Sequence, residues 1–110
     1  MLGVRDTRRV AWRRQHASRH YVGYVTVTDD TVRLAGHEQA TGIDVTHTIP
    51  SDAIRKVRVG REPREEVVGE RSVVLELRDD EPIYVRPVCV GPIDLDGFAR
   101  KLRPAEMRIT

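Results

Sequence analysis

Residues 49–59 are Ile-Pro-Ser-Asp-Ala-Ile-Arg-Lys-Val-Arg-Val, and their apolar positions fit neither a continuous helix nor an unbroken strand. Pro50 has no amide hydrogen and restricts Ile49 to extended backbone, so a strand should end here. The serine and aspartate that follow favour a turn, and the two valines then resume the period of two typical of a half-buried strand. The stretch predicts a strand, a corner and a second strand, with Ile54 packed under the corner.

Three segments before this corner alternate between apolar and polar residues, at positions 24–28, 31–36 and 43–49. The alternation and the many β-branched residues predict a meander of three antiparallel strands, to which residues 54–59 add a fourth. The side chains predicted to face inward are Val25, Val27, Val32, Leu34, Ile43, Val45 and Ile49.

A charged loop over residues 60–71 leads to two more alternating segments, 73–78 and 83–86, which are joined by an Asp-Asp turn. In the second of these segments Tyr84 is predicted to be exposed. Pro87 limits that segment to an edge or an end of the sheet, because proline cannot donate to a ladder of hydrogen bonds.

The apolar spacing then changes from two to that of a helix. The apolar residues at i, i+3, i+4 and i+7 are Leu95, Phe98, Ala99 and Leu102. This spacing predicts one face of a helix of about three turns. Either Asp94 or Asp96 can cap its start, and Pro104 stops it.

Residues 1–20 allow two interpretations. Val10 and Trp12 alternate with polar or small residues, which favours a strand with Trp12 facing inward. A helix that starts near Asp6 is also compatible with the arginine and alanine content. The segment holds six arginines and one acid, a net charge of +5, whereas the remaining residues carry −3.

The chain has 110 residues and a formal net charge of +2, which fits one small domain with a charged surface. A single cysteine excludes an intramolecular disulfide and indicates a reducing compartment, so we expect a cytoplasmic protein. We find neither a secretory signal nor an apolar run of the ~18 residues that a membrane span needs. The strong excess of arginine over lysine indicates GC-rich, bacterial coding.

This order of elements resembles the pleckstrin-homology-like (PH-like) fold of bacterial and GRAM-type domains, a bent seven-stranded barrel closed by a C-terminal helix. The resemblance is carried by the meander 24–49, the corner 49–57, the hairpin 73–85 and the helix 95–102. It implies a mainly β fold of about seven antiparallel strands. If residues 1–20 were helical, a small SH3-like or OB-like barrel would fit better.

The expected organisation is one domain over residues 1–110. It consists of an arginine-rich segment over 1–20, a barrel over 21–90 and a closing helix over 93–103.

The N-terminal arginines are the one sharper functional signal. In lipid-binding PH domains a basic motif spans the first two strands, which implies an anion site here at Arg13, Arg14 and Arg19. This chain departs from that motif, because residues 21–23 are Tyr-Val-Gly where the family has basic residues. The alternative hypothesis is that these arginines are a solvated surface.

No catalytic or metal motif is present in the sequence, so we expect neither an enzyme nor a cofactor. His16 and His20 are too few for a metal site, and His37 and His47 are predicted to lie on the surface. Cys89 has apolar neighbours and is predicted to be a small core residue.

We therefore predict a non-catalytic scaffold that associates with proteins. Self-association would use a free sheet edge or the loop at Val67 and Val68. The alternative is peripheral binding of an anionic ligand, either a lipid headgroup or a nucleic acid, by the N-terminal arginines. The few aromatic residues argue against nucleic acid, and no small-molecule substrate is implied.

Overall fold

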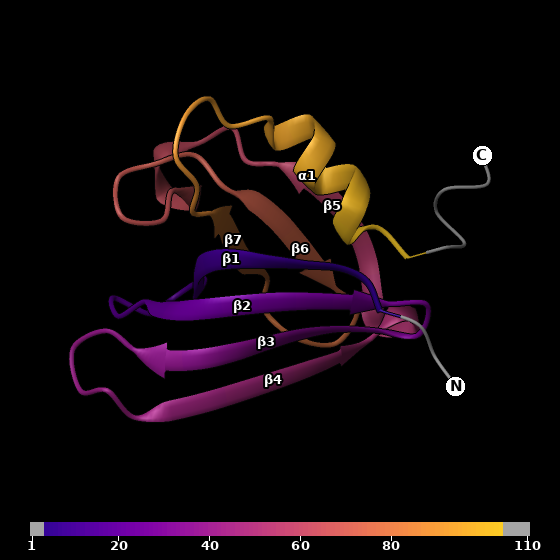
Figure 1. Cartoon of the computed structure of the whole chain (residues 1–110), viewed down its shortest axis with the longest axis horizontal. Coiled ribbons are helices and arrows are strands. Elements are labelled where there is room, and N and C mark those ends of the chain that lie inside the picture. Colours follow the sequence, from indigo (N-terminus) through magenta and orange to yellow (C-terminus); the bar gives the residue numbers. More distant parts are fainter. Residues whose placement is uncertain (1–3, 105–110) are drawn as a thin grey trace.

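Seven strands and one C-terminal helix make up the fold (Figure 1). The computed structural model describes residues 4–104. The strands are β1 (Val4–Arg14), β2 (Tyr21–Thr28), β3 (Thr31–Glu38), β4 (Asp44–Pro50), β5 (Ile54–Val59), β6 (Val73–Leu77) and β7 (Ile83–Pro87). The helix is α1 (Leu95–Leu102), and two short 3-10 turns are η1 (Ser51–Ala53) and η2 (Pro63–Glu65).

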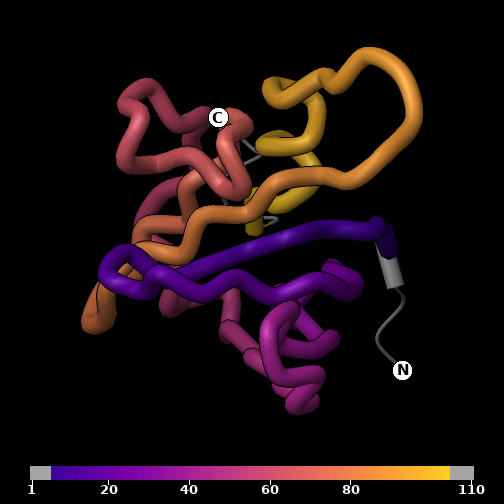
Figure 2. Tube along the Cα trace, turned by 90° about the vertical axis from the view of Figure 1, so that its left-hand side faces the viewer, coloured from indigo at the N-terminus to yellow at the C-terminus, as the bar shows by residue number. Residues whose placement is uncertain are grey.

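The strands form a single antiparallel sheet in the order β4-β3-β2-β1-β7-β6-β5. Strand β1 is central, since it pairs with β2 on one side and with β7 on the other. Figure 2 shows β1 in indigo, with β2, β3 and β4 on one side of it and the later part of the chain on the other. The sheet curls into a half-barrel, so the predicted mainly β fold is confirmed, and so is the strand at Trp12.

The hydrophobic core lies on the concave face of the sheet. Each strand contributes alternate residues to it, and Trp12 at the centre is fully buried. Phe98, Ala99 and Leu102 of α1 cover this face, with the helix packed on β5 and β6. Asp94 caps the helix by accepting a hydrogen bond from the Gly97 amide at 2.9 Å. The helix has eight residues, about two turns. It is shorter than the predicted range 93–103, mainly because the cap at Asp94 makes Leu95 its first residue.

The corner after β4 forms as predicted. Strand β4 ends at Pro50, and η1 turns the chain into β5. The Ser51 amide donates to the carbonyl oxygen of Asp30 at 2.7 Å, and its hydroxyl donates to the carbonyl oxygen of Asp29 at 3.3 Å. Ile54 is 1% exposed, which confirms that it packs under the corner.

Two glycines face each other where β2 and β3 come closest. Gly23 pairs with Gly36, and a Cβ atom added at Gly36 would lie 2.0 Å from the carbonyl oxygen of Val22. No other residue type fits such an approach without a shift of the backbone. The pair therefore permits the close strand contact in this part of the curled sheet.

A second, smaller apolar cluster lies on the convex face and was not predicted. It consists of Ala11, Val67, Val74 and Tyr84, with Val22 packed against it. The prediction that Tyr84 is exposed was wrong, because the loop between β5 and β6 folds back and leaves it 2% exposed. Val67 is likewise fully buried, so of the Val67-Val68 pair only Val68 offers an exposed side chain.

Ile43 is a further correction to the predicted core. It precedes β4 and is 63% exposed, because the chain turns at Gly42 and the strand begins only at Asp44. Val45 and Ile49 do face inward, as predicted.

Candidate functional site

Arg13 lies on the convex face and holds the loop that follows β5. Its Nε donates to the carbonyl oxygen of Glu66 at 2.9 Å, and its Nη2 donates to that of Arg64. The guanidinium carbon also lies 4.7 Å from the centre of the Tyr84 ring, a cation–π contact. These contacts fix Arg13 as a structural link between β1 and the loop.

Arg14 follows Arg13 in the strand and therefore points to the opposite face. Its Nη2 lies 2.6 Å from the Asp80 carboxylate, and its Nε lies 3.2 Å from that of Glu81. The hydrogen bond to Asp80 raises the pKa of Arg14 and lowers that of Asp80. The predicted ligand residue is thus paired with the turn between β6 and β7.

Arg19 lies in the loop between β1 and β2, and its Nη1 is 3.1 Å from the carboxylate of Glu38 on β3. The three predicted site residues therefore have three separate sets of partners: the loop after β5, the β6–β7 turn and the end of β3. The structure does not bring their guanidinium groups together around one hollow. Anion binding by Arg13, Arg14 and Arg19 stays a prediction.

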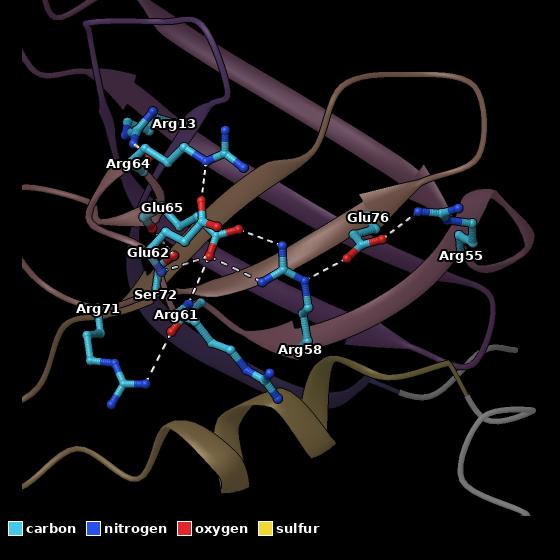
Figure 3. A network of polar contacts seen from close by, with 11 residues as sticks. Arg13, Arg55, Arg58, Arg61, Glu62, Arg64, Glu65, Arg71, Ser72 and Glu76 are labelled. Atoms are coloured by element: carbon cyan, nitrogen blue, oxygen red, sulfur yellow. Dashed lines mark hydrogen bonds and ion pairs between the residues drawn. The ribbon is translucent and has the colours of Figure 1, made fainter.

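The polar network drawn in Figure 3 joins β5, β6 and the loop between them. Nη2 of Arg58 lies 2.5 Å from Glu65 Oε2, and its Nε lies 2.6 Å from Glu76 Oε2. Glu76 also accepts from Arg55 at 2.6 Å. Arg58 is thus held between two carboxylates.

Glu65 is the buried hub of this network, at 5% exposure. Besides Arg58 it accepts from the backbone amides of Arg61 at 2.8 Å and Glu62 at 3.2 Å. The hydrogen bond with Arg58 is the main reason that the pKa of Glu65 is lowered to about 2. Ser72, fully buried, donates its hydroxyl proton to the Glu65 carbonyl oxygen at 2.5 Å. The network clamps the loop over the convex apolar cluster.

Sequence reasoning missed this network because Glu65 lies in what looks like an ordinary charged loop, whereas Arg58 and Glu76 lie on the two strands that flank it. One signal was available. Arg58 and Glu76 alternate with buried valines and leucines on neighbouring strands, and opposite charges at such positions favour cross-strand pairing.

Among residues 4–104, strand β4 pairs with β3 alone and is therefore a free edge of the sheet. The Glu38 amide donates to the Ile43 carbonyl oxygen at 2.9 Å before the strand, and the Ser51 amide donates to Asp30 after it. Bonded positions alternate in an antiparallel ladder. The residues whose backbone groups point away from the sheet are therefore Asp44, Thr46 and Thr48.

The other edge strand, β5, differs from β4 in the features that usually prevent edge pairing. It has a register irregularity between Ile54 and Lys56, and three of its six residues are basic. Charged side chains and bulges both discourage a further strand. Strand β4 has a regular register, and its only charged residue at neutral pH is Asp44, with a proline at its last position.

His47 and Cys89 both differ from their predictions. His47 is half-buried on the inner side of β4, where its ring meets Tyr21 edge-on at 6.2 Å. Burial, together with the charge of Arg14, lowers its pKa. Cys89 is exposed, because the chain leaves the sheet after Pro87; its prediction as a core residue was wrong.

Residues 4–104 contain neither a cluster of metal-ligating side chains nor a membrane-spanning helix. Residues 4–104 hold no group of three or more metal-ligating His, Cys, Asp or Glu side chains. Within the same range we find no helix that is long and apolar enough to cross a membrane.

Comparisons with known proteins show a similar fold but no matching family. No family model matches the sequence, and no curated protein matches it. Among solved structures, the chain is similar to the C-terminal domain of an unknown protein from Leishmania infantum, with a TM-score of 0.57 and 16% identity. The match covers 79% of this chain and 72% of that one. At this identity the likeness shows the fold alone, a curled antiparallel half-barrel with a C-terminal helix.

Proposed function

We propose that this chain is a non-catalytic, PH-like module that associates with a second copy of itself through strand β4. The observation that carries the proposal is the free edge, where the outward backbone groups of Thr46 and Thr48 have no partner among residues 4–104. An exposed edge of this kind is a template for a further strand. The PH-like assignment rests on the order of the strands, the corner at Pro50 and the closing helix.

The sequence of β4 is suited to pair with itself. Two copies paired antiparallel about His47 place Thr46 opposite Thr48 of the second copy, and cross-strand threonine pairs are favourable. The same register places Asp44 opposite Pro50 of the second copy, so the two aspartates do not oppose each other. Pro50 has no amide hydrogen but keeps a carbonyl oxygen that can accept from Asp44.

Proline substitution tests this proposal selectively. The amide of Thr46 points to the free edge, so Thr46→Pro removes a donor that the β3–β4 ladder does not use. The matched control is Thr46→Val, which keeps both the amide and the branched side chain. Sedimentation velocity from micromolar to millimolar concentrations should show a reversible dimer for the wild type and the control.

The proline variant should remain monomeric at concentrations where the control associates, with an unchanged circular dichroism spectrum. A wild type that stays monomeric over the whole range would overturn the proposal. So would a proline variant that dimerises as tightly as the control.

A further inference from the structure

A pocket of about 550 Å³ lies between β5 and the start of α1, away from the β4 edge. Its volume falls in the range of small-ligand sites. Its charged lining residues are Arg58, Arg61, Arg71, Arg103, Asp94 and Asp96. The lining therefore holds four guanidinium groups and two carboxylates, and the positive charge is in excess.

Arg61 and Arg71 carry the uncompensated part of this charge. Both are exposed, and neither takes part in an ion pair of the described residues. Among residues 4–104, Nη2 of Arg71 donates only to the neutral carbonyl oxygen of Gly60, at 3.2 Å. Both side chains line the pocket opposite the start of α1, and Figure 3 shows the Arg61 side chain extending to the helix. They are available to an anion that enters from solvent.

The backbone beneath these two arginines is firmly held. The Arg61 amide donates to the buried Glu65 carboxylate at 2.8 Å, and the Gly60 amide donates to the Ser72 carbonyl oxygen at 2.8 Å. Arg58, in contrast, is already balanced by Glu65 and Glu76. The network of Figure 3 therefore holds the backbone at Arg61 and Arg71 in place, while their side-chain charges are not neutralised by its carboxylates.

The carboxylates of the pocket come from the start of α1. Asp94 is occupied as the helix cap through Gly97, and Asp96 is exposed in the first turn. Carboxylates accept hydrogen bonds from hydroxyl groups but repel phosphate. A ligand that satisfies both parts of the lining carries an anionic group at one end and hydroxyl groups at the other.

We propose that this pocket binds a small phosphate ester with free hydroxyl groups, a sugar phosphate in chemical class. Arg61 and Arg71 bind the phosphate oxygens, because planar guanidinium donors match them in pairs. Asp96 accepts hydrogen bonds from the hydroxyl groups. This site is separate from the N-terminal arginines and from strand β4.

Isothermal titration calorimetry with ribose 5-phosphate, inorganic phosphate and ribose tests the proposal at low and at physiological salt. The ester should bind more tightly than inorganic phosphate, and ribose should give no signal. Changing Arg61 and Arg71 together to Gln should weaken ester binding at least tenfold. The matched control changes Arg9 and Arg33 to Gln, which removes the same charge from two exposed positions on other strands.

The variant Asp96→Asn distinguishes a site for the phosphate ester from a site that binds any anion. It should weaken binding of the ester but strengthen binding of inorganic phosphate, because it removes both a hydroxyl acceptor and a negative charge. Strengthening of both, or equal binding of ester and inorganic phosphate, would overturn the assignment. So would the absence of ester binding at low salt, or equal losses in the double variant and its control.

Discussion

Changing Glu65 to Gln should remove a large share of the stability of the protein. Glu65 is 5% exposed and receives four hydrogen bonds on its carboxylate: two from Arg58 and two from the backbone amides of Arg61 and Glu62. Glutamine has nearly the same shape, so the variant removes the charge while leaving the packing in place. The Arg58 side chain then faces an amide in place of a carboxylate.

The magnitude follows from the pKa of Glu65, which the fold lowers from 4.5 to about 2. A difference of that size corresponds to about 3 kcal/mol of stability at neutral pH. Removing one partner of a buried ion pair costs about 3–5 kcal/mol. Arg58 is partly exposed and keeps Glu76, so we expect a loss of about 2–3 kcal/mol in a domain whose total is about 5–15 kcal/mol.

The pH dependence of stability gives a second measure of what Glu65 contributes to the free energy of unfolding. Because the folded pKa of Glu65 is depressed, its contribution is fully present above pH 4.5 and is lost as the pH falls toward 2. At a pH of about 3 the difference between wild type and variant should fall to about half of its neutral value. Urea unfolding followed by the fluorescence of Trp12, the single and fully buried tryptophan, measures both values.

The matched control is Glu70→Gln, the same substitution at an exposed position of the same loop. It should change the free energy of unfolding by less than about 0.5 kcal/mol. A loss below about 1 kcal/mol for Glu65→Gln, or one that does not shrink on acidification, would refute the view that this network clamps the loop.

Three further outcomes follow from the fold. Phe98→Ala should cost about 3–5 kcal/mol in urea unfolding, since Phe98 joins α1 to the core at 3% exposure; a loss below about 1 kcal/mol would show that the helix does not close it. Gly36→Ala should cost about 1–3 kcal/mol, because its Cβ atom would meet the Val22 carbonyl oxygen; a neutral result in the same assay would show that the strands can separate freely. The lowered pKa of His47 means that the unfolded chain gains a proton first, so stability should fall as the pH drops below about 6.5. His47→Asn should remove that part of the thermal-unfolding profile between pH 7 and pH 5, and an identical profile would contradict the assignment.

The strands and the closing helix could be predicted because their signals are local. Period-two alternation around Val25, Leu34 and Val85, and helical spacing around Phe98, each describe an element that buries one face. The corner at Pro50 could also be predicted, because proline acts on its own neighbours. Trp12 left a choice between strand and helix, which only the pairing of β1 with both β2 and β7 resolves.

The convex cluster and its polar clamp could not be predicted in the same way. Tyr84 occupies a position that alternation assigns to solvent, and it is covered by a distant loop that folds back and by the Arg13 guanidinium. The arginines show the same limit. Their density in the first twenty residues was visible, yet Arg13 and Arg14 point to opposite faces and meet partners more than fifty residues away. The positions of charged residues along the sequence therefore do not determine which partners their side chains contact in the fold.

Amide hydrogen exchange at Thr46 and Thr48, followed as a function of protein concentration, tests the proposed association most directly. At low concentration these two outward amides should exchange rapidly, while those of Val45 and His47, which bond to β3, are protected. At high concentration the amides of Thr46 and Thr48 should become protected as a second copy pairs with β4. Exchange at these two positions that does not change with concentration would contradict the proposal.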